Sequence, residues 1–228
     1  MENIMYEETT IVDEQQKEVV RELMRDVYVW MTGGLALTGA VAWVVANTPA
    51  LLQLIFGNQL IFWGLLIAEI ALVMVLSMRI EKMRFTSAAL MFVLYSALNG
   101  LTLSSIFLLY ELGSIGEIFF VTAGSFAVLA FVGTVTKRDL SGLGTFLIIA
   151  SVVGLIMGRP ESIWMSAIGV MIFAGLTVYD AQQIRTLMLN QETVNEGNMK
   201  LALLGALTLY LDFINLFIRL LSILGKKK

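Results

Sequence analysis

The sequence has 228 residues, of which 58% are hydrophobic and only 14% are charged, so we expect lipid rather than water to surround most of the chain. The formal net charge is -3 and no long basic run occurs, which gives no support for nucleic-acid binding. Cysteine and histidine are both absent, which excludes disulfides, thiol catalysis, cysteine- or histidine-ligated zinc, and every catalytic arrangement that uses histidine.

The chain begins with an acidic, polar segment at residues 1–27, "MENIMYEETTIVDEQQKEVVRELMRDV". A secretory signal peptide has a basic start followed by an apolar core, and this segment has neither. We interpret it as a cytoplasmic segment that becomes helical close to the membrane. Residues 28–224 then form the expected transmembrane domain, and residues 225–228 form a short basic tail.

Seven apolar stretches follow one another along the transmembrane domain. A helix needs about 20 apolar residues to cross roughly 30 Å of hydrocarbon, and all the stretches except the fifth approach or exceed that length. The sequence therefore predicts an all-α membrane protein with seven transmembrane helices. The predicted spans are 28–47, 57–78, 86–110, 115–135, 142–158, 163–184 and 201–224.

Basic residues predict the orientation, because short loops rich in Lys and Arg stay in the cytoplasm. They occur in the N-terminal segment and in the second, fourth and sixth loops, whereas the first and third loops have none and the fifth has only Arg159. We therefore expect a cytoplasmic N-terminus. Seven crossings place the tail "ILGKKK" outside, although its three lysines favour the inside; a re-entrant last segment is the alternative, but that segment is long enough to span.

Three acidic residues, Glu69, Asp180 and Asp212, lie inside predicted spans. An ionised carboxylate at the membrane centre costs roughly 2.5–3.5 kcal/mol, so each needs a partner, a proton or water. Helical spacing adds polar residues to the same faces, which predicts that these faces point into the bundle. The alternative is that they only hold helices together by hydrogen bonds. The polar stripes are Ser96, Asn99, Thr102 and Ser105; Thr177, Asp180 and Gln183; and Thr208, Asp212, Asn215 and Arg219.

Depth along the helices bears on how these groups pair. With the N-terminus inside, Arg79 and Asp180 both fall near the cytoplasmic side, so a contact between them is geometrically feasible, with Arg84 as the alternative partner. Asp212 lies about 12 residues into its span, or roughly 18 Å. A direct contact of Asp180 with Asp212 then requires the last helix to begin in the cytoplasm or its neighbour to tilt.

The stretches "GLTVYDAQQI" and "LTLYLDFINLFIRLL" resemble the Bax inhibitor-1 family, with support from "VYVWMTGGLALTG", "AEIALV" and "KRDLSGLGTFL". The similarity extends over nearly all of residues 25–224 and is most like a bacterial inner-membrane member. It implies a seven-helix bundle with the last helix at its centre, acting as a pH-sensitive calcium leak. It further implies that Asp180 and Asp212 share a proton and that Arg79 contacts Asp180.

On this hypothesis the chain has no resident cofactor and is not an enzyme; calcium is the transported ion and lipid its surroundings. Asp180 and Asp212 are expected calcium ligands when ionised, and Glu69, Asn99 and Asn215 are expected along the ion pathway. One alternative is a membrane interaction protein that restrains a membrane-anchored ATP-dependent protease, as some bacterial relatives do, through the N-terminal segment. A remote alternative is an intramembrane aspartyl protease, but "LYLD" replaces the "GxGD" loop and the "PAL" at 49–51 precedes both aspartates.

Overall fold

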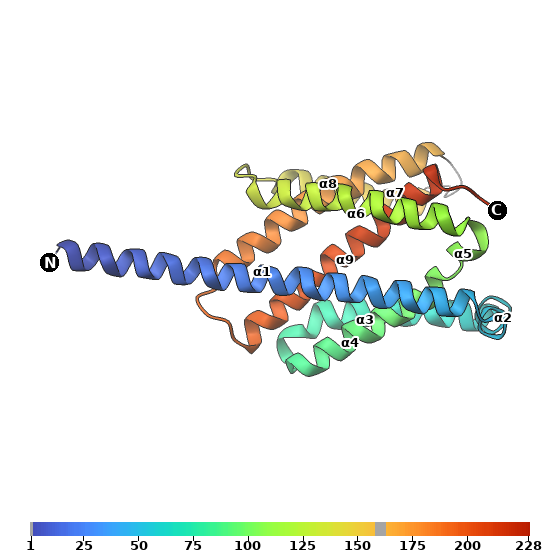
Figure 1. The fold of residues 1–228 in the computed structure, drawn as a ribbon, viewed down its shortest axis with the longest axis horizontal. Helices are drawn as coiled ribbons and strands as arrows, with labels where there is room; N and C mark the ends of the chain where they lie inside the picture. Colours follow the sequence, from blue (N-terminus) through green and yellow to red (C-terminus); the bar gives the residue numbers. More distant parts are fainter. Residues whose placement is uncertain (1, 158–162) are drawn as a thin grey trace.

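The computed structural model of the chain describes residues 2–157 and 163–228, and its long elements are all helices (Figure 1). The predicted fifth-loop residue Arg159 and the end of the predicted span 142–158 lie outside the described residues. The elements are α1 (Glu2–Ala46), α2 (Pro49–Phe56), α3 (Gln59–Arg79), the 3-10 turn η1 (Ile80–Lys82), α4 (Phe85–Leu103), α5 (Ile106–Leu109), α6 (Leu112–Val135), α7 (Ser141–Met157), α8 (Ile163–Leu189) and α9 (Glu196–Leu224).

Local sequence signals account for where several helices begin. Pro49, which has no amide hydrogen to leave unpaired, opens the short α2 in the first connection. The Asn58 side chain accepts a hydrogen bond from the Leu60 amide at 3.0 Å and caps α3. Asn195 does the same for the Asn198 amide at the start of α9, at 3.0 Å. Polar caps thus separate the apolar runs into distinct helices.

Six of the seven predicted spans correspond to helices that are long and apolar enough to cross a membrane: Glu14–Ala46, Gln59–Lys82, Phe85–Leu109, Leu112–Val135, Ile163–Leu189 and Glu196–Leu224. The predicted span 142–158 corresponds to α7, whose described apolar part, Ser141–Val152, is shorter. Six of the seven predicted helices are therefore long enough to cross a membrane, and the fifth, predicted from the shortest apolar stretch, corresponds to the shorter helix α7.

The outer surface of the bundle is apolar, as expected for a protein in lipid. Leu60, Phe120 and Trp164 are 83%, 76% and 81% exposed. Apolar side chains exposed on many helices are unfavourable in water but cost nothing in hydrocarbon. The helix α9 differs from the others: 67% of its most apolar stretch is buried, against 11–33% in the other five long helices.

Figure 1 shows the path of α9 relative to the other helices. It runs obliquely across the bundle and packs against α1, α4, α6 and α8, while α3 packs against α4 and α7 against α8. The N-terminus, the α3–α4 turn, the α6–α7 loop and the α8–α9 loop lie toward one end of the bundle. The C-terminus and the connections through α2 and α5 lie toward the opposite end.

The predicted boundary at residue 27 falls inside α1, which is continuous from Glu2 to Ala46. Leu23 and Val27 are completely buried, so the bundle core begins before the apolar window does. The Gln16 side chain donates to the Leu189 carbonyl at 2.8 Å and ties this part of α1 to the end of α8. Part of the segment predicted to precede the membrane domain therefore packs with it.

The basic C-terminal tail is docked on the connection between α5 and α6. The amide of Glu111 donates to the Lys226 carbonyl at 2.9 Å, and the amide of Lys228 donates to the Leu109 carbonyl at 3.0 Å. The Lys228 ammonium group donates to the Phe107 carbonyl at 2.7 Å. These bonds hold the tail at the end of the bundle opposite the N-terminus (Figure 1).

Candidate functional site

Asp180 of α8 and Asp212 of α9 face each other where these two helices pack. Their carboxyl groups are close enough for a side-chain hydrogen bond. Asp212 is 5% exposed and Asp180 is half-buried. The structure thus places together two residues whose predicted depths did not bring them together.

The chemistry of this contact depends on one proton. An ionised carboxylate only accepts hydrogen bonds, so two ionised groups cannot bond to each other, whereas a protonated group donates to its neighbour. When both groups are taken as ionised, the buried Oδ2 atom of Asp212 has no donor. A buried acceptor without a donor is costly, and a proton between the two groups removes that cost.

The aspartate pair does not form a ready metal centre. Calcium takes six to eight oxygen ligands, and two carboxylates supply at most four. Across residues 14–152 and 163–228, whose side chains the structure describes, no cluster of three or more His, Cys, Asp or Glu side chains is arranged to hold a metal ion. The pair therefore suits transient contact with a cation together with water or backbone oxygens.

The predicted arginine partners lie away from this pair. Arg79 is exposed in the last turn of α3, and Arg84 is exposed immediately before α4. No ion pair joins Arg79 or Arg84 to Asp180 among the described residues. The α3–α4 turn is instead held by Lys200 of α9, whose ammonium group donates to the carbonyls of Glu81 and Met83 at 3.0 Å each.

The third intramembrane acid, Glu69, belongs to a second polar site. It lies on α3, is 8% exposed, and accepts hydrogen bonds from two side chains of α4. The donors are the Asn99 amide at 3.2 Å and the Thr102 hydroxyl at 2.9 Å. The structure therefore unites Glu69 with Asn99, as expected if both belong to one polar route.

This second site continues to α9 and α1 through residues that the sequence did not single out. The Tyr210 hydroxyl donates to the Asn99 side-chain oxygen at 3.0 Å and lies 2.6 Å from the Thr38 hydroxyl. The Thr38 hydroxyl also lies 2.8 Å from the Ser96 carbonyl. We call Thr38, Glu69, Asn99, Thr102 and Tyr210 the glutamate network; it joins α1, α3, α4 and α9.

Tyr210 and Asp212 are two residues apart on α9, which rotates the two side chains by about 200° around the helix axis. They therefore occupy nearly opposite faces, with Tyr210 toward α4 and Asp212 toward α8. Asn215, which was predicted on the pathway, is half-buried and donates to the Leu211 carbonyl of its own helix at 2.8 Å. Its described hydrogen bond does not join it to either site.

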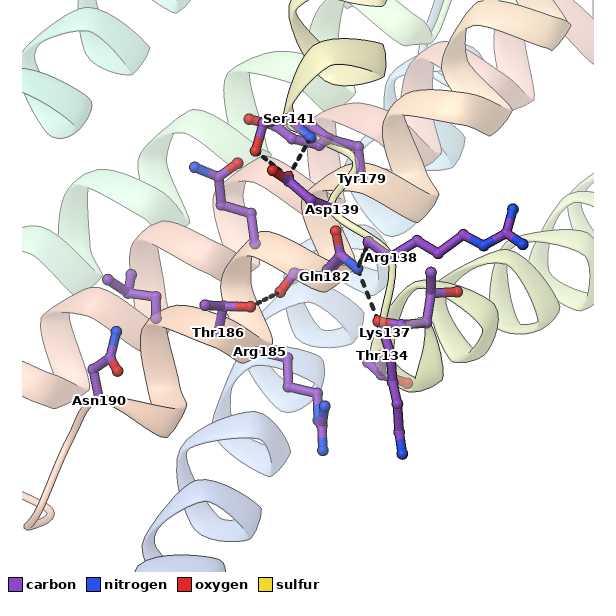
Figure 2. Close-up of a pocket in the computed structure, with 13 residues that line it drawn as sticks. Thr134, Lys137, Arg138, Asp139, Ser141, Tyr179, Gln182, Arg185, Thr186 and Asn190 are labelled. Carbon is purple, nitrogen blue, oxygen red and sulfur yellow. Dashed lines mark hydrogen bonds between the residues drawn. The ribbon is translucent and has the colours of Figure 1, made fainter.

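A polar pocket of about 690 Å³ opens between α8 and the α6–α7 loop (Figure 2), and this loop lies toward the same end of the bundle as the N-terminus (Figure 1). Gln182 forms its wall: its amide nitrogen donates to the carbonyls of Thr136 and Arg138, both at 2.8 Å, and holds the α6–α7 loop. We call it the basic pocket, because Lys137, Arg138 and Arg185 line it. From the sequence, these residues were predicted only to orient the chain in the membrane, since isolated loop cations carry no signal of a pocket.

One carboxylate, Asp139, also lines the basic pocket. Its Oδ1 atom accepts hydrogen bonds from the Ser141 amide, at 2.9 Å, and from the Ser141 hydroxyl at the start of α7. These two hydrogen bonds lower the pKa of the exposed Asp139 carboxyl below its ordinary value. Asp139 is thus a helix-capping anion rather than a proton carrier.

Comparison with known proteins identifies relatives along nearly the whole chain. The model of the family described as "Inhibitor of apoptosis-promoting Bax1" matches residues 20–228. The inner membrane protein YbhL of Escherichia coli K12 is 44% identical over 224 residues, which cover 94% of this chain and 95% of YbhL. An uncharacterized protein of Deinococcus radiodurans is 40% identical over 92% of this chain and 93% of its own length. An uncharacterized protein of Borreliella burgdorferi is 35% identical over 96% of this chain and 98% of its own length.

Proposed function

The chain belongs to the Bax inhibitor-1 family, and we propose that it is a pH-sensitive calcium leak of a bacterial inner membrane, gated by the Asp180–Asp212 pair. The observation that carries the proposal is the contact between two carboxyl groups on α8 and α9, one of which has a buried oxygen without a donor. With one proton shared, the two carboxyl groups form a hydrogen bond; without it, two carboxylates repel each other.

The gating step follows from where the pair lies. With one proton, the two carboxyl groups hold α8 and α9 together. Loss of that proton leaves two anions in a buried site, which favours separation of the helices, entry of water, or neutralisation by a divalent cation. The glutamate network supplies a further set of oxygen atoms on the other side of α9, within one helical turn of Asp212, and we propose it as the second station for the ion.

We further propose that α7 completes a seventh crossing and that α9 forms the centre of the bundle. The proposal is supported by the two termini, which lie at opposite ends, as an odd number of crossings requires (Figure 1). The high burial of α9 supports its central place. The basic loops share one end of the bundle with the N-terminus, which supports a cytoplasmic N-terminus.

The test is calcium flux in proteoliposomes across acidic to neutral pH. We expect Asp180→Asn and Asp212→Asn each to abolish the pH dependence, because an amide donates a hydrogen bond at every pH. Asp139→Asn is the matched control, since it makes the same chemical change at an exposed carboxyl and asparagine also caps helices. Unaltered pH dependence in both pair variants would refute the gating role.

A second function is favoured by the N-terminal part of α1, which projects beyond the other helices (Figure 1). A projecting helix suits docking of a protein partner such as a membrane-anchored protease, and would let the chain regulate it. Deleting residues 1–22 separates the two functions. Loss of partner control with intact flux favours the interaction role, and loss of flux with intact partner control favours the leak.

Two facing aspartates also suit an aspartyl protease, the remaining alternative. The "LYLD" and "PAL" contexts described above speak against it. Cleavage of a peptide by the purified protein in detergent, abolished by either Asp→Asn variant, would overturn the leak in favour of proteolysis.

A further inference from the structure

A second cavity, of about 830 Å³, runs along the side of the bundle. We call it the lateral groove; α1 and α6 form its two walls, and Phe213 of α9 forms part of its floor. Its volume lies in the range of roughly 300–1,000 Å³ that small-molecule sites occupy. Its lining is almost wholly apolar and includes Met31, Leu35, Ala123, Phe126, Ala127 and Phe131.

The lateral groove meets the basic pocket at one end. Thr134 and Arg185 line both cavities, so the apolar channel ends at a cationic side chain. In Figure 2 the side chains of Arg185 and Lys137 extend in the same direction, and the guanidinium group of Arg185 ends beside the ribbon of α1, which forms one wall of the groove. Both residues are exposed, and in the described part of the chain neither forms an ion pair. The nearby Asp139 carboxylate accepts hydrogen bonds from Ser141 and forms no ion pair with either cation.

The groove is long enough to hold an acyl chain that spans one leaflet of a bilayer. It extends along α6 from Thr134 to Phe119, 15 residues or about 22 Å at 1.5 Å per residue. One leaflet contributes about 15 Å of hydrocarbon, half of the roughly 30 Å core. Phe131, which lines the groove, is 66% exposed, so the groove is open to the surface that faces lipid.

We propose that the lateral groove and the basic pocket together bind one anionic phospholipid. An acyl chain lies along the groove between α1 and α6, and the phosphate headgroup contacts Arg185 and Lys137. Guanidinium and ammonium groups bind phosphate by charge-assisted hydrogen bonds, and arginine matches its geometry. The channel is apolar, which does not suit a soluble anion, and it ends at a cation, which does not suit an uncharged hydrocarbon. An anionic amphiphile that enters from the membrane fits both features.

The experiment measures retention of phosphatidylglycerol by the full-length protein, by native mass spectrometry in detergent with phosphatidylcholine as competitor. We expect preference for phosphatidylglycerol. A cation that contacts the lipid headgroup is expected to strengthen binding by about fivefold, so Lys137→Gln with Arg185→Gln is expected to weaken binding by about 25-fold. The pair Lys82→Gln with Arg84→Gln removes the same charge at the same end of the bundle, outside both cavities, and is expected to bind like the wild type.

The acyl-chain part is tested by filling the groove. Ala127→Phe places a ring in the channel at an exposed position, and Ala123→Leu is a milder substitution in the same wall. Both are expected to weaken phosphatidylglycerol binding at least fivefold, whereas Val128→Phe, on the lipid-facing side of α6, leaves it unchanged. Three results would each overturn the proposal. The first is that the charge control loses as much lipid binding as Lys137→Gln with Arg185→Gln, and the second is that neither groove substitution weakens binding. The third is that equimolar glycerol 3-phosphate or inorganic phosphate displaces the lipid.

The proposal is independent of calcium flux. The protein can retain the lipid in this experiment even if it conducts no calcium, and the charge variants leave the Asp180–Asp212 pair unchanged. A bound lipid would contact Phe213, the residue after Asp212, so the occupied groove lies against the same helix as the gating pair.

Discussion

Replacing Tyr210 by phenylalanine tests whether the glutamate network stabilises the bundle. The substitution removes one hydroxyl that bonds the Asn99 side-chain oxygen at 3.0 Å and lies 2.6 Å from the Thr38 hydroxyl. The ring stays, and with it the edge-to-face contacts with Phe92 and Tyr95, whose centroids are 6.0 Å and 5.7 Å away. The change therefore isolates two hydrogen bonds between helices.

Such bonds between membrane helices contribute about 0.6 kcal/mol each on average, with a maximum near 1.7. Loss of both is expected to lower the free energy of unfolding by about 1.2 kcal/mol. A value above this indicates that the Asn99 oxygen and, through it, Glu69 also lose their arrangement.

The measurement is reversible unfolding in mixed micelles, followed by circular dichroism as the denaturing detergent increases. Tyr95→Phe is the matched control: Tyr95 is buried beside Tyr210, but its hydroxyl has no hydrogen bond among the described residues. Equal destabilisation by Tyr210→Phe and Tyr95→Phe would refute the network as a source of stability.

Three further predictions concern other parts of the fold. Gly133→Ala sets a methyl group 2.3 Å from the Val178 carbonyl of α8 and is expected to destabilise the α6–α8 contact by about 1–3 kcal/mol in the same unfolding assay; Gly124→Ala on α6, with open space around it, is the control. Ser141→Ala is expected to raise the pKa of Asp139 toward its ordinary value, seen by carboxyl carbon NMR. Because the native pKa of Asp139 is lowered, its hydrogen bonds with Ser141 stabilise the fold above the ordinary aspartate pKa, and this stabilisation is lost as the pH falls through the lowered pKa. A titration midpoint of Asp139 that is the same in Ser141→Ala and in the wild type would contradict this. Lys200→Met is expected to speed amide exchange at residues 80–84, whereas exchange equal to wild type would show that the α3–α4 turn holds without it.

Hydropathy was enough to locate most of the helices. The predicted span 115–135 agrees with α6, Leu112–Val135, and the family resemblance stated from the sequence is confirmed. The short helix α2 was missed because eight residues in a connection leave no long apolar run. Helix ends were also missed: α8 continues to Leu189 and α9 begins at Glu196, five residues beyond the predicted 184 and five before the predicted 201. Helices continue past the apolar window because polar residues at the membrane surface are as helical as buried ones.

The candidate site was only partly predictable for a related reason. Glu69, Asp180 and Asp212 stand out because a carboxylate in an apolar run is costly. Tyr210 does not, because tyrosine is common in such runs and only its partners on α1 and α4 reveal a role. The Asp180–Asp212 contact required the early start and oblique path of α9, and neither can be read from hydropathy.

The helix α9 connects the two polar sites mechanically. Asp212 meets α8 on one face and Tyr210 meets α4 and α1 on the nearly opposite face, within a single turn of helix. A helix turn is stiff over this length, so a shift of α9 that separates the aspartates also moves the Tyr210 hydroxyl relative to Asn99. Hydrogen bonds weaken steeply when they lengthen or bend, so the glutamate network changes together with the aspartate pair. In the proposed gating mechanism, we therefore expect a protonation event at one face of α9 to reach an acid on α3 without any contact between Asp212 and Glu69.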